Sequence, residues 1–124
     1  MPPDDPRPNE QPAPAVEVSS AGAGAVVALR GEHDRNSRPA VAAALARARG
    51  HGDVLVDLCD CAFIDSTIIG VVVAAFQAQA DAGRRLELVV PPAAQALRRV
   101  TEVAGLATFM TIHETRAAGL ASLG

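Results

Sequence analysis

Short runs of valine and leucine alternate along the chain with longer segments rich in alanine. Runs at 54–58 and 86–90 predict buried strands, and runs at 16–18 and 25–29, separated by serine, alanine and glycine, predict a hairpin. Strands separated by helical segments connect by right-handed crossovers and form a sheet with helices packed on it. We therefore predict an α/β fold, a single domain with a mixed β-sheet and helices packed on that sheet.

Four segments have the apolar spacing or the composition of helices. The first spans 38–49 and ends at Gly50, and its expected buried residues are Val41, Ala44, Leu45 and Ala48. The second spans 67–82, and its expected buried residues are Ile69, Val72, Val73, Phe76 and Ala80. A third helix is predicted at 93–103, a short strand near 109–112, and a last helix from about residue 114.

The composition limits the kinds of partner. Of the 124 residues only 2% are aromatic, and the net charge is −3. Both values argue against a surface that binds nucleic acid. No apolar run reaches the roughly 20 residues that span a bilayer, and the N-terminus lacks the pattern of a secretory signal. We expect a cytoplasmic protein without direct membrane insertion.

Residues 1–14 contain six of the nine prolines and mostly polar neighbours. Proline at this density disrupts helices and sheets, and the segment has little apolar surface to bury. We therefore predict a disordered proline-rich tail at 1–14 and a folded domain at 15–124.

The most informative segment runs from residue 56 to residue 70. A predicted strand ends, a short loop follows, and Asp65, Ser66 and Thr67 stand where the next helix begins. One interpretation is a helix N-cap, in which a side-chain oxygen accepts a hydrogen bond from a free N–H of the first turn. The other is a hydroxyl group that is exposed at the helix N-terminus and available for modification. These three residues alone leave both interpretations open.

Five motifs, in order along the chain, resemble the STAS domain in the branch of the anti-sigma factor antagonists. The strand end 57–58, the apolar position Cys61 and the segment 63–70 resemble the signature of that family. The segment 29–34 resembles its Gly-Glu-x-Asp turn, 83–89 its fourth strand, and 97–100 with 104–106 its third helix and the exit from it. The resemblance extends from about residue 16 to residue 123.

The resemblance implies a phosphorylation-switched binding protein. The family residue that matches Ser66 is phosphorylated, so Ser66 is the expected acceptor, Thr67 is a lesser candidate, and Asp65 is the neighbour that positions the acceptor. The surrounding face, to which Asp34 and Ile68 would contribute, docks an anti-sigma factor of the histidine-kinase-like ATPase fold. The unphosphorylated protein would sequester this kinase and so free a sigma factor for transcription.

Two of these residues carry a further expectation. Asp34 precedes the predicted helix at 38–49, so its carboxylate could equally serve as a cap for that helix. Ile68 stands where the family usually has glycine, and we expect it to add bulk on the first exposed turn.

Cys59 and Cys61 are expected to be structural. A structural zinc site normally takes four protein ligands, and Cys61 occupies a position that is usually apolar in the family, so a small buried side chain is the favoured role. His33 and His113 have no partner pattern and are predicted to be ordinary surface residues. We expect no metal and no cofactor.

The sequence contains no nucleophile elbow, zinc-protease motif, phosphate-binding loop or dinucleotide fingerprint. Asp57, Asp60 and Asp65 are close in the sequence, but nothing requires them to converge, so an enzyme is not expected. Two alternatives to the antagonist stay open. One is a non-catalytic STAS subunit of a lipid-transport or larger signalling complex, and the other is a STAS domain that senses a small ligand or a nucleotide.

Overall fold

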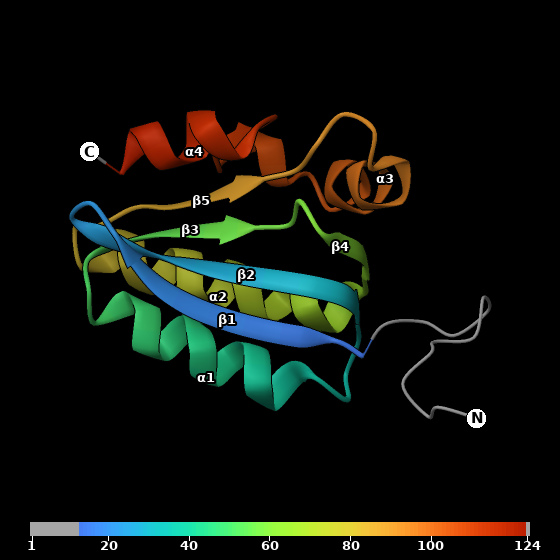
Figure 1. Cartoon of the computed structure of the whole chain (residues 1–124), viewed down its shortest axis with the longest axis horizontal. Helices are drawn as coiled ribbons and strands as arrows, with labels where there is room; N and C mark the ends of the chain where they lie inside the picture. Colours follow the sequence, from blue (N-terminus) through green and yellow to red (C-terminus); the bar gives the residue numbers. More distant parts are fainter. Residues whose placement is uncertain (1–12, 124) are drawn as a thin grey trace, which may run out of the picture.

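The structure is a computed structural model that describes residues 13–123. Six strands form one mixed sheet: β1 (Ala15–Ala21), β2 (Gly24–His33), β3 (Asp53–Asp57), β4 (Cys61–Ile64), β5 (Leu86–Val89) and β6 (Ile112–His113). The helices are α1 (Arg38–Arg49), α2 (Ser66–Asp81), α3 (Gln95–Val103) and α4 (Arg116–Ser122), with a 3-10 turn, η1 (Leu106–Thr108). Figure 1 shows α1 and α2 on one side of the sheet and α4 on the other. The predicted α/β fold is confirmed.

The strand order is β1-β2-β3-β5-β6, and β4 pairs with β2. β1 and β2 form the predicted antiparallel hairpin, and the other pairings are parallel. The first half of β2 (24–28) pairs with β3, and its last residues (31–33) pair with β4. The chain therefore leaves β2 and β4 side by side at one end of the sheet, and α2 begins immediately after β4.

Side chains that alternate along the strands build two cores. Val27, Val56 and Leu88 belong to the larger cluster, which also includes the buried residues of α1 and α2. Leu55 and Val89, on the opposite face, belong to a smaller cluster together with Leu123 at the end of α4. The α4 face therefore has the thinner apolar layer.

The first predicted helix has the predicted bounds and the four predicted buried residues. The predicted face of the second helix is only partly correct, because Ile68, Ala75 and Gln79 are buried whereas Ala80 is exposed. The Gln79 side chain is tolerated in the core because its amide donates to the backbone carbonyls of Gly52 (2.7 Å) and Arg85 (3.0 Å).

Three other details differ from the sequence predictions. The predicted loop before residue 65 contains β4, which is too short and too weakly patterned to be recognised as a strand. The strand predicted near 109–112 is found at Ile112–His113, after η1 in the chain. The last helix begins at Arg116 because the Thr115 hydroxyl accepts from the N–H of Ala118 and caps it.

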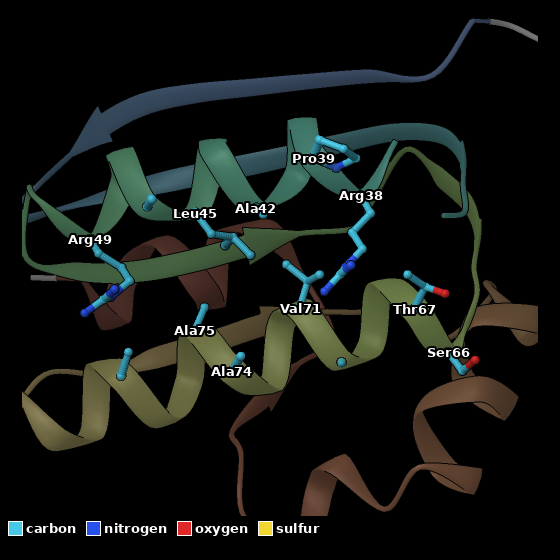
Figure 2. Close-up of a pocket in the computed structure, with 13 residues that line it drawn as sticks. Arg38, Pro39, Ala42, Leu45, Arg49, Ser66, Thr67, Val71, Ala74 and Ala75 are labelled. Carbon is cyan, nitrogen blue, oxygen red and sulfur yellow. The ribbon is translucent and has the colours of Figure 1, made fainter. Parts of the chain in front are cut away.

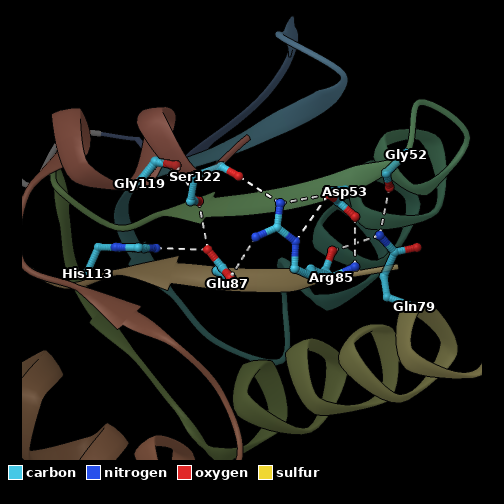
Figure 3. A network of polar contacts seen from close by, with 8 residues as sticks. All are labelled: Gly52, Asp53, Gln79, Arg85, Glu87, His113, Gly119 and Ser122. Carbon is cyan, nitrogen blue, oxygen red and sulfur yellow. Dashed lines mark hydrogen bonds and ion pairs between the residues drawn. The ribbon is translucent and has the colours of Figure 1, made fainter. Parts of the chain in front are cut away.

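A polar network fastens α4 to the sheet and links β6 to β5 (Figure 3). Arg85 donates to Asp53 (3.0 Å) and to the carbonyl of Ser122 (2.7 Å). Glu87 accepts from the Ser122 hydroxyl (2.7 Å) and lies 2.8 Å from Nε2 of His113. Burial alone would raise the pKa of Glu87, but the hydrogen bonds from His113 and Ser122 outweigh it and lower that pKa. The prediction that His113 is an ordinary surface residue is wrong, because its side chain is half-buried in this network.

Residues 1–12, which hold most of the predicted disordered tail, lie outside the described residues. Within residues 13–123, none of the helices combines the length and the apolar character that a membrane crossing requires.

Candidate functional site

The junction between β4 and α2 presents a hydroxyl group that takes no part in capping the helix. Asp65 is the N-cap of α2: its backbone is extended, and its Oδ1 accepts from the N–H of Ile68 at 3.1 Å. Ser66 is the first residue of the helix and is exposed, whereas Thr67 is half-buried. The two interpretations of this segment therefore fall on different residues. The cap is Asp65, and the exposed hydroxyl is that of Ser66.

The end of β2 holds this junction in place. The N–H of Asp65 donates to the carbonyl of His33 (3.2 Å), which continues the β2–β4 pairing to the start of α2. The prediction that His33 lies on the surface is wrong, because its side chain is buried at 1% exposure. Its Nε2 donates to the carbonyl of Arg30 (2.9 Å), and its Nδ1 lies 3.0 Å from Oγ of Ser37. A buried imidazole therefore fixes the turn that leads from β2 into α1.

Asp34 follows His33 and is exposed at the same end of the sheet. Its carboxylate accepts from the N–H of Asn36 (2.9 Å), within the turn before the helix. The N-cap of α1 is Ser37, and no side-chain hydrogen bond caps that helix. The interpretation of Asp34 as the cap of α1 is therefore wrong, and its carboxylate remains accessible from solvent.

Ile68 does not lie on the exposed surface of the first turn. Its side chain is completely buried in the main core. The expectation that it adds exposed bulk beside Ser66 is wrong, because the third position of α2 faces the sheet and not the solvent. Ile68 therefore cannot contact a docked protein directly, and it leaves access to the Ser66 hydroxyl unobstructed.

An ion pair that sequence reasoning missed fixes the loop before β4. Asp57 is buried at the end of β3, where Oδ1 accepts from the N–H of Cys59 (2.9 Å) and Oδ2 pairs with Nε of Arg116 (2.6 Å). Burial tends to raise the pKa of Asp57, but these hydrogen bonds and the guanidinium charge lower it overall. Arg116 also reaches Asp60 (3.2 Å) and so joins α4 to this loop. The sequence contained one signal of this ion pair, namely the carboxylate of Asp57 at the end of an apolar strand.

Burial disfavours the charged thiolate form of both cysteines. Cys61 is buried, as predicted, and Cys59 is half-buried. Burial raises the pKa of each thiol to about 11, and the neighbouring Asp57 carboxylate contributes to the shift at Cys59. No group of three or more potential metal ligands occurs among residues 13–123. Asp57 and Asp60 both pair with the guanidinium of Arg116, so the positive charge between these two carboxylates is an arginine.

A groove of about 750 Å³ runs between α1 and α2 and opens beside Ser66. Small and apolar side chains line most of it, with Arg38 and Arg49 from α1 toward its two ends (Figure 2). Ser66 and Thr67 form part of the lining at the Arg38 end. Phe63, which is 37% exposed, precedes the junction on β4. One end of the domain thus combines a free hydroxyl, an exposed aromatic ring, a carboxylate and an open groove.

Several solved structures share this fold. An anti-sigma factor antagonist from Mycobacterium paratuberculosis is similar with a TM-score of 0.80 at 20% identity, covering 90% of this chain and 94% of that one. A putative anti-sigma factor antagonist from Thermotoga maritima has a TM-score of 0.74 at 19% identity, covering 87% and 93% of the two chains. The phosphorylated form of the Bacillus cell fate determinant SpoIIAA has a TM-score of 0.68 at 20% identity, covering 89% and 100%. At these identities the similarity establishes the fold alone.

The sequence comparisons give the family. No curated protein matches the chain. Residues 16–113 match the family model described as "Mlab, STAS domain", which spans the sheet from β1 to the end of β6. The chain therefore belongs to the STAS-domain family.

Proposed function

We propose that this protein is an anti-sigma factor antagonist switched by phosphorylation of Ser66. The observation that carries the proposal is the exposed Ser66 hydroxyl at the start of α2, which is released from capping because Asp65 performs that task. Similarity in fold to proteins described as anti-sigma factor antagonists, one of them in a phosphorylated form, supports the same interpretation.

Ser66 is a better acceptor than Thr67 because it is more exposed. A kinase partner would transfer the γ-phosphoryl group of ATP to Oγ of Ser66, releasing ADP and the hydroxyl proton. The product carries about −1.5 to −2 charges at pH 7. The start of a helix tolerates such a charge, so the domain stays folded.

The docking surface would surround Ser66. Phe63 supplies an apolar group that can be buried on binding, and Asp34 supplies a negative charge at the same end of the sheet. A phosphate introduced at the centre of that surface must lose its hydration when the anti-sigma factor binds, and this desolvation costs several kcal/mol. Phosphorylation would therefore release the anti-sigma factor, which we expect to have the histidine-kinase-like ATPase fold. In this role the protein acts by binding and not as an enzyme.

The test is a titration of the anti-sigma ATPase from the same cells against the wild type and variants. Ser66→Ala should bind like the wild type but accept no phosphate from the partner and ATP. Ser66→Asp should bind at least about tenfold more weakly, or about 1.4 kcal/mol, and Phe63→Ala should weaken binding without unfolding the domain. Thr67→Val, which keeps the shape of the side chain, is the matched control and should still be phosphorylated.

Stability measurements separate the switch from folding. Ser66→Ala should change the free energy of unfolding by less than about 0.5 kcal/mol, whereas Asp65→Ala should lower it by about 1 kcal/mol through loss of the cap. Equal binding by the wild type, Ser66→Ala and Ser66→Asp, with no phosphate on residue 66 or 67, would refute the proposal. Copurification with a membrane-transport ATPase, or saturable binding of a nucleotide, would support one of the two alternatives.

A further inference from the structure

Arg38 is the cation at the end of the groove where Ser66 lies. It is the first residue of α1, and it lines the same groove as Ser66 and Thr67. In Figure 2 its side chain extends from α1 into the groove toward Val71 of α2, and Ser66 lies beyond Thr67 at that end of the groove. Ser66 and Arg38 are thus contributed by the first residues of two neighbouring helices.

The guanidinium of Arg38 has no partner in the part of the chain that the structure describes. Within residues 13–123, Arg30, Arg85 and Arg116 each pair with a carboxylate, and Arg49 donates to the side chain of Gln79. No ion pair or side-chain hydrogen bond of Arg38 occurs among these residues. The groove thus contains one arginine that is engaged and one whose donors are available.

The position of Arg38 is unfavourable for the helix that carries it. The amino end of a helix bears a partial positive charge, so a cation there is disfavoured. The first turn of α1 contains no acidic residue to compensate. A positive charge at this place gains nothing from α1, and its side chain reaches into the groove that Ser66 also lines. These features suit the binding of an anion between the two helix starts.

We propose that Arg38 clamps the phosphate carried by Ser66 and so joins the start of α1 to the start of α2. This inference rests on the proposed phosphorylation of Ser66 and adds the group that holds the product. A guanidinium presents two parallel N–H donors that match two phosphate oxygens. In the unmodified protein the Arg38 side chain lies in the groove, so forming the clamp requires this side chain to turn toward Ser66.

The experiment uses the full chain with phosphoserine incorporated at position 66 during translation. The second ionisation of its phosphate is followed by phosphorus NMR as the pH changes. An unperturbed phosphoserine has a second pKa of about 6, and a clamping guanidinium lowers it because it favours the dianion. We expect Arg38→Gln to increase the proton affinity of the phosphate at least about threefold.

Two controls separate a specific clamp from a general effect of positive charge. Arg49→Gln, at the far end of the same groove, should leave the titration unchanged. Arg38→Lys should restore only part of the shift, because it keeps the charge but loses the paired donors. Circular dichroism of each variant verifies that it is folded, since Arg38 is exposed and its replacement removes no core contact.

The result that overturns the clamp is a phosphate titration that is the same in the wild type and Arg38→Gln. An equal shift by Arg38→Gln and Arg49→Gln also overturns it, because it would indicate a diffuse field. No partner is present in this measurement, so the clamp can fail while the binding switch at Ser66 holds. Conversely, an anti-sigma factor that binds the phosphorylated and unphosphorylated protein equally well would refute the switch, and the phosphate titration would be unaffected.

Discussion

The approach of α4 to the sheet leads to a prediction about two glycines. Gly119 is buried in the middle of α4, and a methyl group added there would lie 2.7 Å from Cγ2 of Val89 and 2.9 Å from Cδ2 of Leu55. Carbon atoms pack best at about 3.5–4.0 Å, so each contact is short by roughly 1 Å. Leu55 and Val89 are both fully buried, and a close-packed core leaves little space into which such side chains can move. Gly119→Ala therefore forces α4 away from the sheet.

The expected magnitude combines two opposing effects. Overpacking of a core costs about 1–3 kcal/mol, and replacing a helical glycine by alanine recovers up to about 1 kcal/mol. Because the added methyl group would contact two fully buried side chains, the cost of overpacking lies in the upper part of that range, and Gly119→Ala should lower the free energy of unfolding by about 1–2 kcal/mol. Gly70, inside α2, is the matched control, because a methyl group there would meet no atom within 4 Å. Gly70→Ala should raise the free energy of unfolding by about 0.5–1 kcal/mol.

Urea unfolding followed by circular dichroism measures both variants against the wild type. The two midpoints should move in opposite directions, and the thermal midpoints should differ by several degrees, since about 1 kcal/mol corresponds to roughly 4 °C in a domain of this size. If Gly119→Ala is as stable as the wild type, or more stable, the close packing of α4 on Leu55 and Val89 is wrong. A destabilised Gly70→Ala would show that α2 lacks the open space on its groove side.

Two further predictions follow from the pKa shifts. The pKa of Asp57 is lowered in the folded protein. Its ion pair therefore stabilises the fold above the unfolded pKa of about 3.9 and loses that effect as the pH falls through the folded pKa. Asp57→Asn should make the free energy of unfolding less dependent on pH in the acid range, and an unchanged dependence would contradict the pairing. The pKa values of about 11 for Cys59 and Cys61 predict slow alkylation by iodoacetamide at pH 8 compared with free cysteine. Mass spectrometry checks this, and rapid labelling of the native protein would contradict it.

Local patterns in the sequence were sufficient for much of the fold. The bounds of α1 and its four buried residues were correct because a long helix repeats its apolar face several times. β4 escaped detection because four residues, two of them exposed, give no repeat to recognise. The start of α2 was located to within one residue because residues typical of a helix N-terminus precede a long apolar helix.

The candidate site was only partly predictable. The sequence pointed to Asp65 and Ser66, but it could not say which of them caps the helix, because that depends on the direction of each side chain. It predicted exposed positions for Ile68 and His33, but both side chains are buried in the folded protein. Apolar or polar character alone does not tell whether a residue in the first turn of a helix faces the sheet.

Three features were predictable from the sequence because they depend on residues close together in the chain: the alternation of strands and helices, the limits of α1 and the position of the segment that starts α2. Which distant residues meet was visible only in the folded structure. Asp57 and Arg116 are 59 residues apart and pair only because α4 packs across the sheet. Arg38 and Ser66 share a groove only because α1 and α2 lie side by side on the same face. Such contacts depend on the mutual packing of whole elements, about which neighbouring residues in the sequence carry no direct information.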